Sequence, residues 1–141
     1  MFKHYGMTAT LLAIAFGGGF LVGHGAPVAA QAKNRVFEIR TYTMNDGRLD
    51  TLVKRLRQGE ARLFDKVGMQ GVGFFVAAEP PKSENTFVYI LAHESRERAK
   101  ESWAKFTNDP EWQTLRQTAE SPGPIKVESI FVSPVDFSPL K

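Results

Sequence analysis

Residues 36–43 alternate between apolar and polar side chains and are rich in β-branched and aromatic types, which predicts a β-strand. Because successive side chains of a strand point in opposite directions, this strand has two distinct faces. One face carries Phe37, Ile39 and Thr41, and the other carries Glu38, Arg40 and Tyr42.

The next segment has the spacing of an amphipathic helix. Asn45-Asp46-Gly47 is a turn and cap signal, and apolar residues then recur at helical spacing from Leu49 to Val67. Arginines and lysines fill the other positions with acidic residues among them, so we interpret this side as a solvated face rather than a binding patch. Gly68 then predicts the end of the helix.

Two strands joined by a loop are predicted next. Residues 71–78 predict a buried strand, and the proline-containing run 80–85 predicts a loop because proline cannot continue the strand. Residues 86–93 predict a third strand that pairs with the second as a hairpin. Tyr89 and His93 fall on the same face of this strand, four residues apart.

A second helical region and a last strand complete the pattern. Ser95 is suited to cap a helix, and Asp109-Pro110 is the signal of a fresh helix start. Trp103 and Trp112 lie at helical spacing with other apolar residues, so we interpret them as core residues of the helix faces. Residues 125–132 predict the fourth strand.

The order of the predicted elements is β-α-β-β-α-β, which is the ferredoxin-like split βαβ arrangement. The fold class is therefore α+β, with a four-stranded antiparallel sheet and two helices on one of its faces. We expect the other face to carry Tyr42, Tyr89 and Leu91, which are too apolar to remain in contact with water. A second copy packed sheet to sheet would cover them, so we expect a homodimer.

Composition narrows the classes of partner and site. The chain has 141 residues, the usual size of one domain, and a formal net charge of +3 without a run of Lys and Arg. We therefore expect no nucleic-acid partner. The absence of cysteine excludes disulfides, zinc-thiolate sites and cysteine nucleophiles.

The N-terminal segment has the features of a secretory signal peptide. Residues 1–32 contain no Asp or Glu, and Lys3 precedes an apolar run over 8–23 that is followed by Ala30-Gln31-Ala32. We expect cleavage after Ala32, which leaves a periplasmic or secreted domain of residues 33–141 with no membrane attachment. The alternative is an uncleaved membrane anchor, for which the apolar run is short.

Five segments resemble the NIPSNAP family, in the correct order along nearly all of residues 36–141. They are Phe37-Glu-Ile-Arg-Thr-Tyr-Thr43, Gly47-Arg48-Leu49-Asp50, Asn85 to Ser95, Arg98 with Asp109-Pro110-Glu111-Trp112, and Phe137-Ser138-Pro139-Leu140. The resemblance implies a dimeric α+β barrel. It implies little about activity, because this fold hosts many functions.

The third predicted strand departs from the family pattern. Tyr89 stands where many members have His, Leu91 in place of Trp, Ala92 in place of Arg, and His93 in place of Tyr. A ligand known for another member therefore does not transfer to this chain.

Histidine usage limits the chemistry further. His4 and His24 leave with the signal peptide, so His93 is the one histidine of the mature chain. A site with two or three histidines within one subunit is thus excluded, and we expect no metal and no cofactor. A Ser-His-Asp triad would have to be built around His93, and the sequence has no G-x-S-x-G motif.

One group of polar and aromatic residues is a candidate ligand-binding site. By alternation, Glu38, Arg40 and Tyr42 on the first strand and Tyr89 and His93 on its neighbour share one face of the sheet. Such a set could bind a small hydrophobic, aromatic or acidic molecule. The alternative is a structural ion pair between Glu38 and Arg40, with the aromatic residues packed at a dimer interface.

Two classes of function follow. The first is an exported, dimeric module that binds a small molecule or another protein. The second is an enzyme, similar to cofactor-independent monooxygenases or isomerases of the same fold, in which His93 acts as a base. Haem binding through His93 is a third, weaker alternative.

Overall fold

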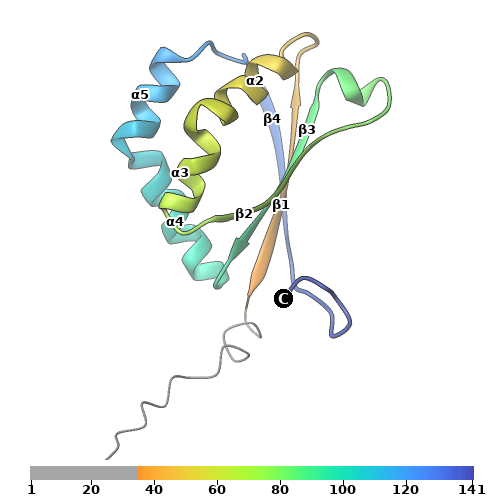
Figure 1. Cartoon of the computed structure of the whole chain (residues 1–141), viewed down its shortest axis with the longest axis vertical. Helices are drawn as coiled ribbons and strands as arrows, with labels where there is room; N and C mark the ends of the chain where they lie inside the picture. The colour runs from red at the N-terminus through yellow and green to blue at the C-terminus, as the bar shows by residue number, and fades with distance from the viewer. Residues whose placement is uncertain (1–34) are drawn as a thin grey trace, which may run out of the picture.

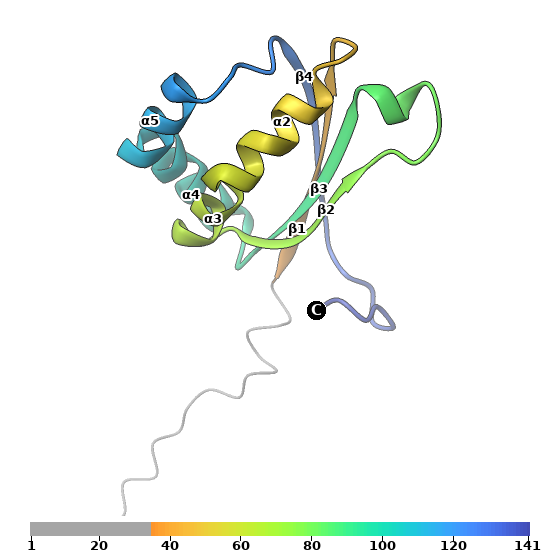
Figure 2. The same cartoon turned by 45° about the horizontal axis from the view of Figure 1, so that its top comes forward.

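The computed structural model describes residues 35–141, and the predicted signal peptide at 1–32 lies outside the described residues. The elements are β1 (Val36–Met44), α2 (Leu49–Arg55), η1 (Leu56–Glu60), α3 (Ala61–Lys66), β2 (Gln70–Val76), η2 (Lys82–Glu84), β3 (Thr86–His93), α4 (Arg96–Asn108), α5 (Pro110–Thr118) and β4 (Ile125–Val132). The four strands form one sheet, and all the longer helices lie on the same side of it (Figures 1 and 2). The predicted α+β, ferredoxin-like fold is confirmed.

The sheet has the order β2-β3-β1-β4, with every neighbouring pair antiparallel. The two strands that carry the predicted site residues, β1 and β3, are therefore the central pair. Their register places Arg40 opposite Tyr89 and Val36 opposite His93. The prediction that the two strands are neighbours with their site residues on one face is confirmed.

The first helical region is bent where the sequence predicted one regular helix. Elements α2, η1 and α3 follow one another as a bent helix in Figure 1, and the bend is at Gly59, whose φ is 157°. This φ favours glycine, and it marks a kink between two helical pieces. Glu60 lies four residues after the buried Leu56 and three before the buried Leu63, and it is 3% exposed.

The second helical region begins and breaks where the caps predicted. Ser95 Oγ accepts a hydrogen bond from the Arg98 backbone N–H at 3.2 Å. The Asp109 carboxylate accepts from the backbone N–H of Glu111 at 2.8 Å, and Pro110 occupies the first turn of α5. This break lets the rings of Phe106 and Trp112 pack against each other with centroids 4.7 Å apart.

The structure corrects the prediction of which sheet face carries the tyrosines. Tyr42, Tyr89 and Leu91 point toward the helices and belong to the main hydrophobic cluster, with Tyr89 and Leu91 fully enclosed. They were expected on the uncovered face. The error arose because alternation shows which residues share a face but not which face the helices cover.

The second strand is also corrected. It was predicted to be buried, but β2 is an edge strand, and Phe74, Phe75 and Val76 are between 40% and 52% exposed. A run of apolar residues has the same sequence pattern in a central strand and in an edge strand, so the sequence alone could not distinguish the two positions.

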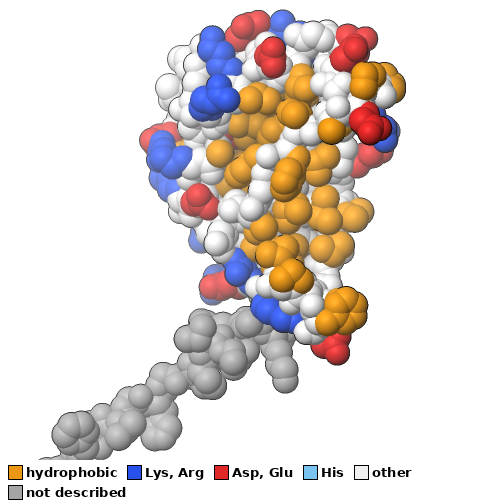
Figure 3. Space-filling model, turned by 45° about the vertical axis from the view of Figure 1, so that its right-hand side comes forward, with side chains coloured by type: hydrophobic (Ala, Val, Ile, Leu, Met, Phe, Trp, Pro, Cys, Tyr) orange, Lys and Arg blue, Asp and Glu red, His pale blue; other side chains and the backbone are white. Residues whose placement is uncertain are grey.

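The sheet face away from the helices is also apolar, but its apolar residues are not Tyr42, Tyr89 and Leu91. Register places Ile39, Val88, Ile90, Phe75 and Ile130 on this face, and Ile130 is 60% exposed. Figure 3 shows hydrophobic side chains gathered on the side of the molecule away from the helices. We call these five residues the uncovered apolar face. Within residues 35–141, no helix has the length and hydropathy needed to cross a membrane.

Candidate functional site

The carboxylate of Glu38 is the centre of a polar cluster between the sheet and α4. It accepts hydrogen bonds from four side chains on four different elements and is 1% exposed. The donors are Arg40 Nη1 at 2.7 Å, Trp103 Nε1 at 2.7 Å, Ser129 Oγ at 2.7 Å and His93 Nε2 at 3.1 Å. Burial raises the pKa of Glu38, but the hydrogen bonds from these four donors outweigh it and lower the pKa from 4.5 to about 2.

Arg40 has a buried hydrogen-bond donor that no described residue accepts from. Its guanidinium lies over the Trp103 ring, with Cζ 4.3 Å from the ring centroid, and donates to Glu38. Its Nε is buried without a hydrogen-bond partner among the described residues. Burial opposes the charge of Arg40, but Tyr89, Tyr42 and Glu38 raise its pKa above the ordinary value, so the guanidinium stays charged.

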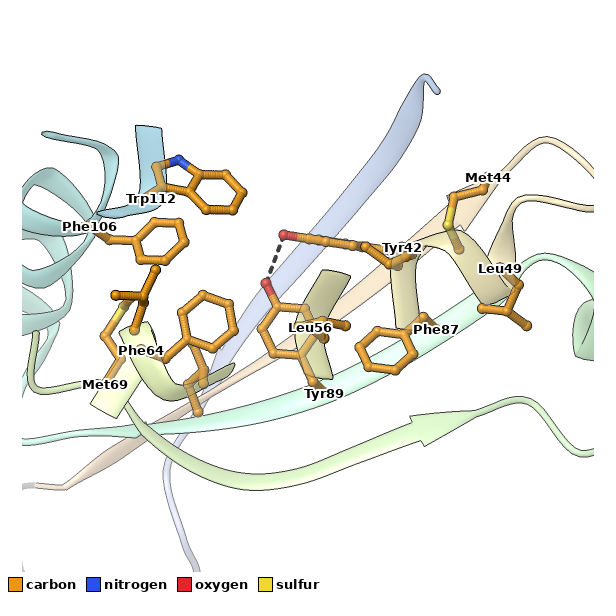
Figure 4. Packing of buried hydrophobic residues seen from close by; sticks show 13 residues of the cluster. Tyr42, Met44, Leu49, Leu56, Phe64, Met69, Phe87, Tyr89, Phe106 and Trp112 are labelled. Atoms are coloured by element: carbon orange, nitrogen blue, oxygen red, sulfur yellow. Dashed lines mark hydrogen bonds between the residues drawn. The ribbon is translucent and has the colours of Figure 1, made fainter. Parts of the chain in front are cut away.

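The two predicted tyrosines form a buried pair beside this guanidinium. Tyr89 Oη donates to Tyr42 Oη at 2.7 Å, and the rings meet edge to face with centroids 5.2 Å apart. Figure 4 shows both hydroxyls turned toward the side on which Trp112 and Phe106 lie. Burial raises the pKa of Tyr89, so its phenol stays protonated and donates.

His93 lies at the far end of the cluster and is fully enclosed. A carboxylate only accepts, so the Nε2 that lies 3.1 Å from Glu38 Oε2 must carry the hydrogen. His93 Nδ1 is buried with no partner among the described residues. Haem ligation through Nε2 would require the loss of the bond to Glu38.

A second buried carboxylate, which the sequence did not predict, is that of Glu60 in η1. Glu60 Oε2 accepts from Arg55 Nε at 2.8 Å, and Arg55 stacks on Trp112, with Cζ 5.3 Å from the ring centroid. Among the described residues, no side chain donates to Glu60 Oε1. Burial raises the pKa of Glu60 above 4.5 in spite of the opposing charges of Arg55 and Arg40.

The cluster reaches the surface over β4. Register places Val127 and Ser129 on the helix side of this edge strand, opposite Tyr42 and Arg40. Val127 is 44% exposed and Ser129 is also exposed, although both face the layer that the helices occupy. The helices therefore do not cover this edge of the sheet, and Arg40, with 17% of its side chain exposed, lies at the margin.

All five predicted site residues come together, and the structure adds four more: Arg55, Glu60, Trp103 and Ser129. Trp103 was interpreted as a core residue, but its indole N–H is one of the donors to Glu38. The available signal for Glu60 was its spacing, because it falls between Leu56 and Leu63 on the apolar side of the helix. Ser129 required the register between β1 and β4, which the sequence does not give.

The described residues contain no group of three or more His, Asp or Glu side chains placed to hold a metal ion. Three surface hollows of about 410, 320 and 250 Å³ lie outside the cluster: one between η1 and α5, one between η1 and β2, and one between the central strands and the C-terminal segment. What distinguishes the cluster is its set of enclosed polar atoms, of which Arg40 Nε and His93 Nδ1 have no partner.

Comparisons with known proteins agree with the fold and with the sequence motifs. The NIPSNAP family model matches residues 37–139. A search of curated protein sequences gives no match. The solved structure of an uncharacterized NIPSNAP-like domain protein from Burkholderia xenovorans is similar with a TM-score of 0.65 at 19% identity, covering 76% of this chain and 90% of that one.

Two Agrobacterium tumefaciens structures are similar at higher identity. One is a NIPSNAP family protein with unknown function, with a TM-score of 0.64 at 25% identity over 77% of this chain and 96% of that one. The other, also a NIPSNAP family protein, has a TM-score of 0.63 at 24% identity over 77% and 92%. Because the family model spans most of the sequence and the fold agrees, the chain belongs to the NIPSNAP family.

Proposed function

We propose that this NIPSNAP domain is an exported homodimer that binds a small aromatic or acidic molecule inside each subunit. The binding site consists of Glu38, Arg40, Tyr42, Tyr89 and His93, and a ligand would enter over the edge of the sheet at β4, where Val127 and Ser129 are exposed. The observation that carries the proposal is the pair of enclosed polar atoms without partners, Arg40 Nε and His93 Nδ1. Buried polar groups are normally paired, so an unpaired set beside an opening is suited to a ligand.

The surroundings of these atoms favour an aromatic or anionic molecule. Arg40 supplies a permanent positive charge, and the Arg40 and Arg55 guanidiniums, which lie over Trp103 and Trp112, present cationic planes on the helix side. The Tyr42 hydroxyl accepts from Tyr89, so its own hydrogen is available for a ligand oxygen. A planar acid could thus lie against these guanidinium planes while its oxygens accept from Arg40 and Tyr42.

The uncovered apolar face supports a homodimer. Ile130 and Phe75 are 60% and 52% exposed on a sheet face that no helix of the described residues covers. A second copy would bury both of these residues, and the same patch on two copies forms the isologous contact of a twofold dimer. Substituting Ile130→Asp should give monomers in size-exclusion chromatography with light scattering, while Lys105→Asp on exposed α4 leaves the dimer intact. A wild-type monomer would contradict the dimer.

Native mass spectrometry of the protein purified from its exported compartment tests the remaining parts of the proposal. We expect dimers of chains cleaved after Ala32 that carry additional mass from a retained small molecule. The Arg40→Gln variant should lose this mass, and the Arg98→Gln variant, altered at an exposed α4 position, should retain it. Retention of the same mass by Arg40→Gln would show that the ligand binds outside this cluster.

In the enzyme alternative, the same cluster must bind the small molecule and also convert it to a product. A cofactor-independent monooxygenase or isomerase must change its ligand, so the molecule retained by the wild type would have to be consumed or converted on incubation in air. Recovery of the retained molecule unchanged favours the binding module.

A further inference from the structure

The charges enclosed near the site are balanced before any ligand binds. Glu38 and Glu60 carry one negative charge each when ionised, and Arg40 and Arg55 carry one positive charge each. The two ion pairs, Arg40–Glu38 and Arg55–Glu60, have nitrogen–oxygen distances of 2.7 and 2.8 Å. An anion that entered this neutral group would leave one enclosed negative charge without a partner, which is unfavourable in a region of low dielectric.

The two carboxylates differ in their capacity to accept a proton that restores the balance. Both oxygens of Glu38 are occupied by donors, Oε1 by Arg40 and Ser129 and Oε2 by His93 and Trp103. Glu60 has one donor, Arg55, and its Oε1 accepts from no side chain of the described residues. A proton on Glu60 Oε1 therefore breaks no hydrogen bond, whereas a proton on Glu38 would displace a donor.

The groups that face Glu60 come from each layer around it. Arg55 from α2 donates to it, and Arg40 from β1 lies near enough for its charge to affect the pKa of Glu60. Glu60 in turn affects the pKa of Tyr89 on β3, and Tyr42 is bonded to Tyr89. The α5 helix contributes Trp112, which is uncharged and packs on Arg55. Among these facing groups of the described residues, Glu60 is thus the one carboxylic acid.

We infer that the interior site takes up a weak organic acid together with one proton, that the anionic oxygens of the ligand lie at Arg40, and that the proton is held by Glu60. When the ligand enters as a neutral acid, its O–H bond breaks and a Glu60 O–H bond forms. When it enters as an anion, Glu60 takes the proton from solvent. Either route keeps the net charge of the enclosed group at zero. The inference rests on the proposed function, because it requires a ligand at Arg40.

The position of Glu60 in the helix supports a specific role. Glu60 falls on the apolar side of the helix, between the buried Leu56 and Leu63, where a charged residue is rarely found unless it is paired, and it is 3% exposed. Burial raises the pKa of Glu60, which makes it a better proton acceptor near neutral pH.

The test uses benzoate as the probe, because it is a planar aromatic anion at neutral pH. Isothermal titration calorimetry of the mature dimer between pH 5.5 and 8.5, in buffers of different ionisation enthalpy, measures affinity and proton uptake together. For the wild type we expect uptake approaching one proton per subunit. The affinity should fall by about tenfold per pH unit above the pKa of Glu60 in the free protein.

Two variants distinguish this role from a structural one. Glu60→Gln removes the proton acceptor and its negative charge, so we expect no proton uptake, no dependence of affinity on pH over this range, and tighter binding than the wild type at pH 8.5. A variant that merely lost structure would bind more weakly at every pH. Glu111→Gln, at an exposed acid of α5, should behave as the wild type.

The contrary outcomes separate the inference from the proposed function. Benzoate binding that requires Arg40 but proceeds without proton uptake overturns the role of Glu60 and leaves the proposed site standing. Proton uptake that persists in Glu60→Gln and disappears in His93→Gln assigns the proton to His93 and overturns the inference in the same way. Equal benzoate binding by the wild type and Arg40→Gln, or none by either, contradicts the site itself.

Discussion

Glu38 and Glu60 are both closed to solvent, at 1% and 3% exposure, but their surroundings drive their pKa values in opposite directions. Glu38 lies in the central strand β1 and accepts from four side chains, so its pKa falls to about 2. Glu60 lies in the π-helical turn η1 and accepts from Arg55 alone, so burial raises its pKa. The difference shows that the number of donors, rather than burial, decides whether an enclosed carboxylate holds its charge.

This contrast separates two roles within one cluster. Glu38 joins β1, β3, β4 and α4 through its four hydrogen bonds, so we expect it to act mainly on stability. Glu60 has an oxygen that accepts no side-chain hydrogen bond among the described residues, so we expect it to act mainly on ligand binding.

The largest expected effect is at Glu38. The Glu38→Gln variant removes the negative charge that pairs with Arg40 and places amide hydrogens among four donors. Breaking a buried ion pair by changing one partner lowers the free energy of unfolding by about 3–5 kcal/mol. Denaturant unfolding of wild type and variant at pH 7 measures the difference. A loss no greater than that of Glu101→Gln, at an exposed acid of α4, would show that the four hydrogen bonds contribute little.

Acid should remove the same stabilisation without mutation. A carboxyl whose pKa is lowered on folding stabilises the folded state above its unfolded pKa of 4.5 and loses that contribution as pH falls toward about 2. The loss from this group is on the order of 3 kcal/mol over that interval. Unfolding curves at pH 5, 4, 3 and 2 should thus converge for wild type and Glu38→Gln. Parallel curves would contradict the lowered pKa.

The sequence was sufficient for the fold and for the Glu38 half of the cluster. Alternation in residues 36–43 and 86–93 placed all five predicted site residues on one face, and the caps Ser95 and Asp109 marked both helix starts. These signals depend only on residues close together in the sequence, so they can be recognised without knowing which elements pack against each other. Which face the helices cover is not local, and Tyr42, Tyr89 and Leu91 were accordingly assigned to the wrong side.

The Glu60 half was missed although the spacing contained a signal for it. Glu60 lies four residues after Leu56 and three before Leu63, which places it on the apolar side of a regular helix, but its charge led us to count it with the solvated face. The buried residues before and after Gly59 keep this spacing, so the kink bends the helix without changing which positions face the core. Glycine marks where a bend is allowed, but packing decides whether it occurs.

A smaller effect is expected at Gly59, where the bend can be disturbed directly. Its φ of 157° favours glycine, so Gly59→Ala should lower the free energy of unfolding by about 1–3 kcal/mol. Gln58→Ala, at the exposed preceding position, should be nearly neutral. Because Glu60 shares its helical face with Leu56 and Leu63, it should stay buried even in a regular helix, and the pH dependence of benzoate binding should be retained. A fully stable Gly59→Ala protein would show that the bend does not require glycine.

The smallest effect on stability is expected at Glu60, although its effect on binding should be large. Burial raises its pKa, so folding is opposed by its ionisation, and this penalty grows as pH rises above 4.5. Glu60→Gln removes the penalty but also weakens the bond to Arg55, so the net change at pH 8 should be below about 1 kcal/mol in either direction. Compared with the variant, the wild type should become relatively less stable between pH 5 and pH 8, as measured by denaturant unfolding at both values. A loss at Glu60→Gln as large as that at Glu38→Gln would mean that both carboxylates are structural, and the contrast between the two halves of the cluster would disappear.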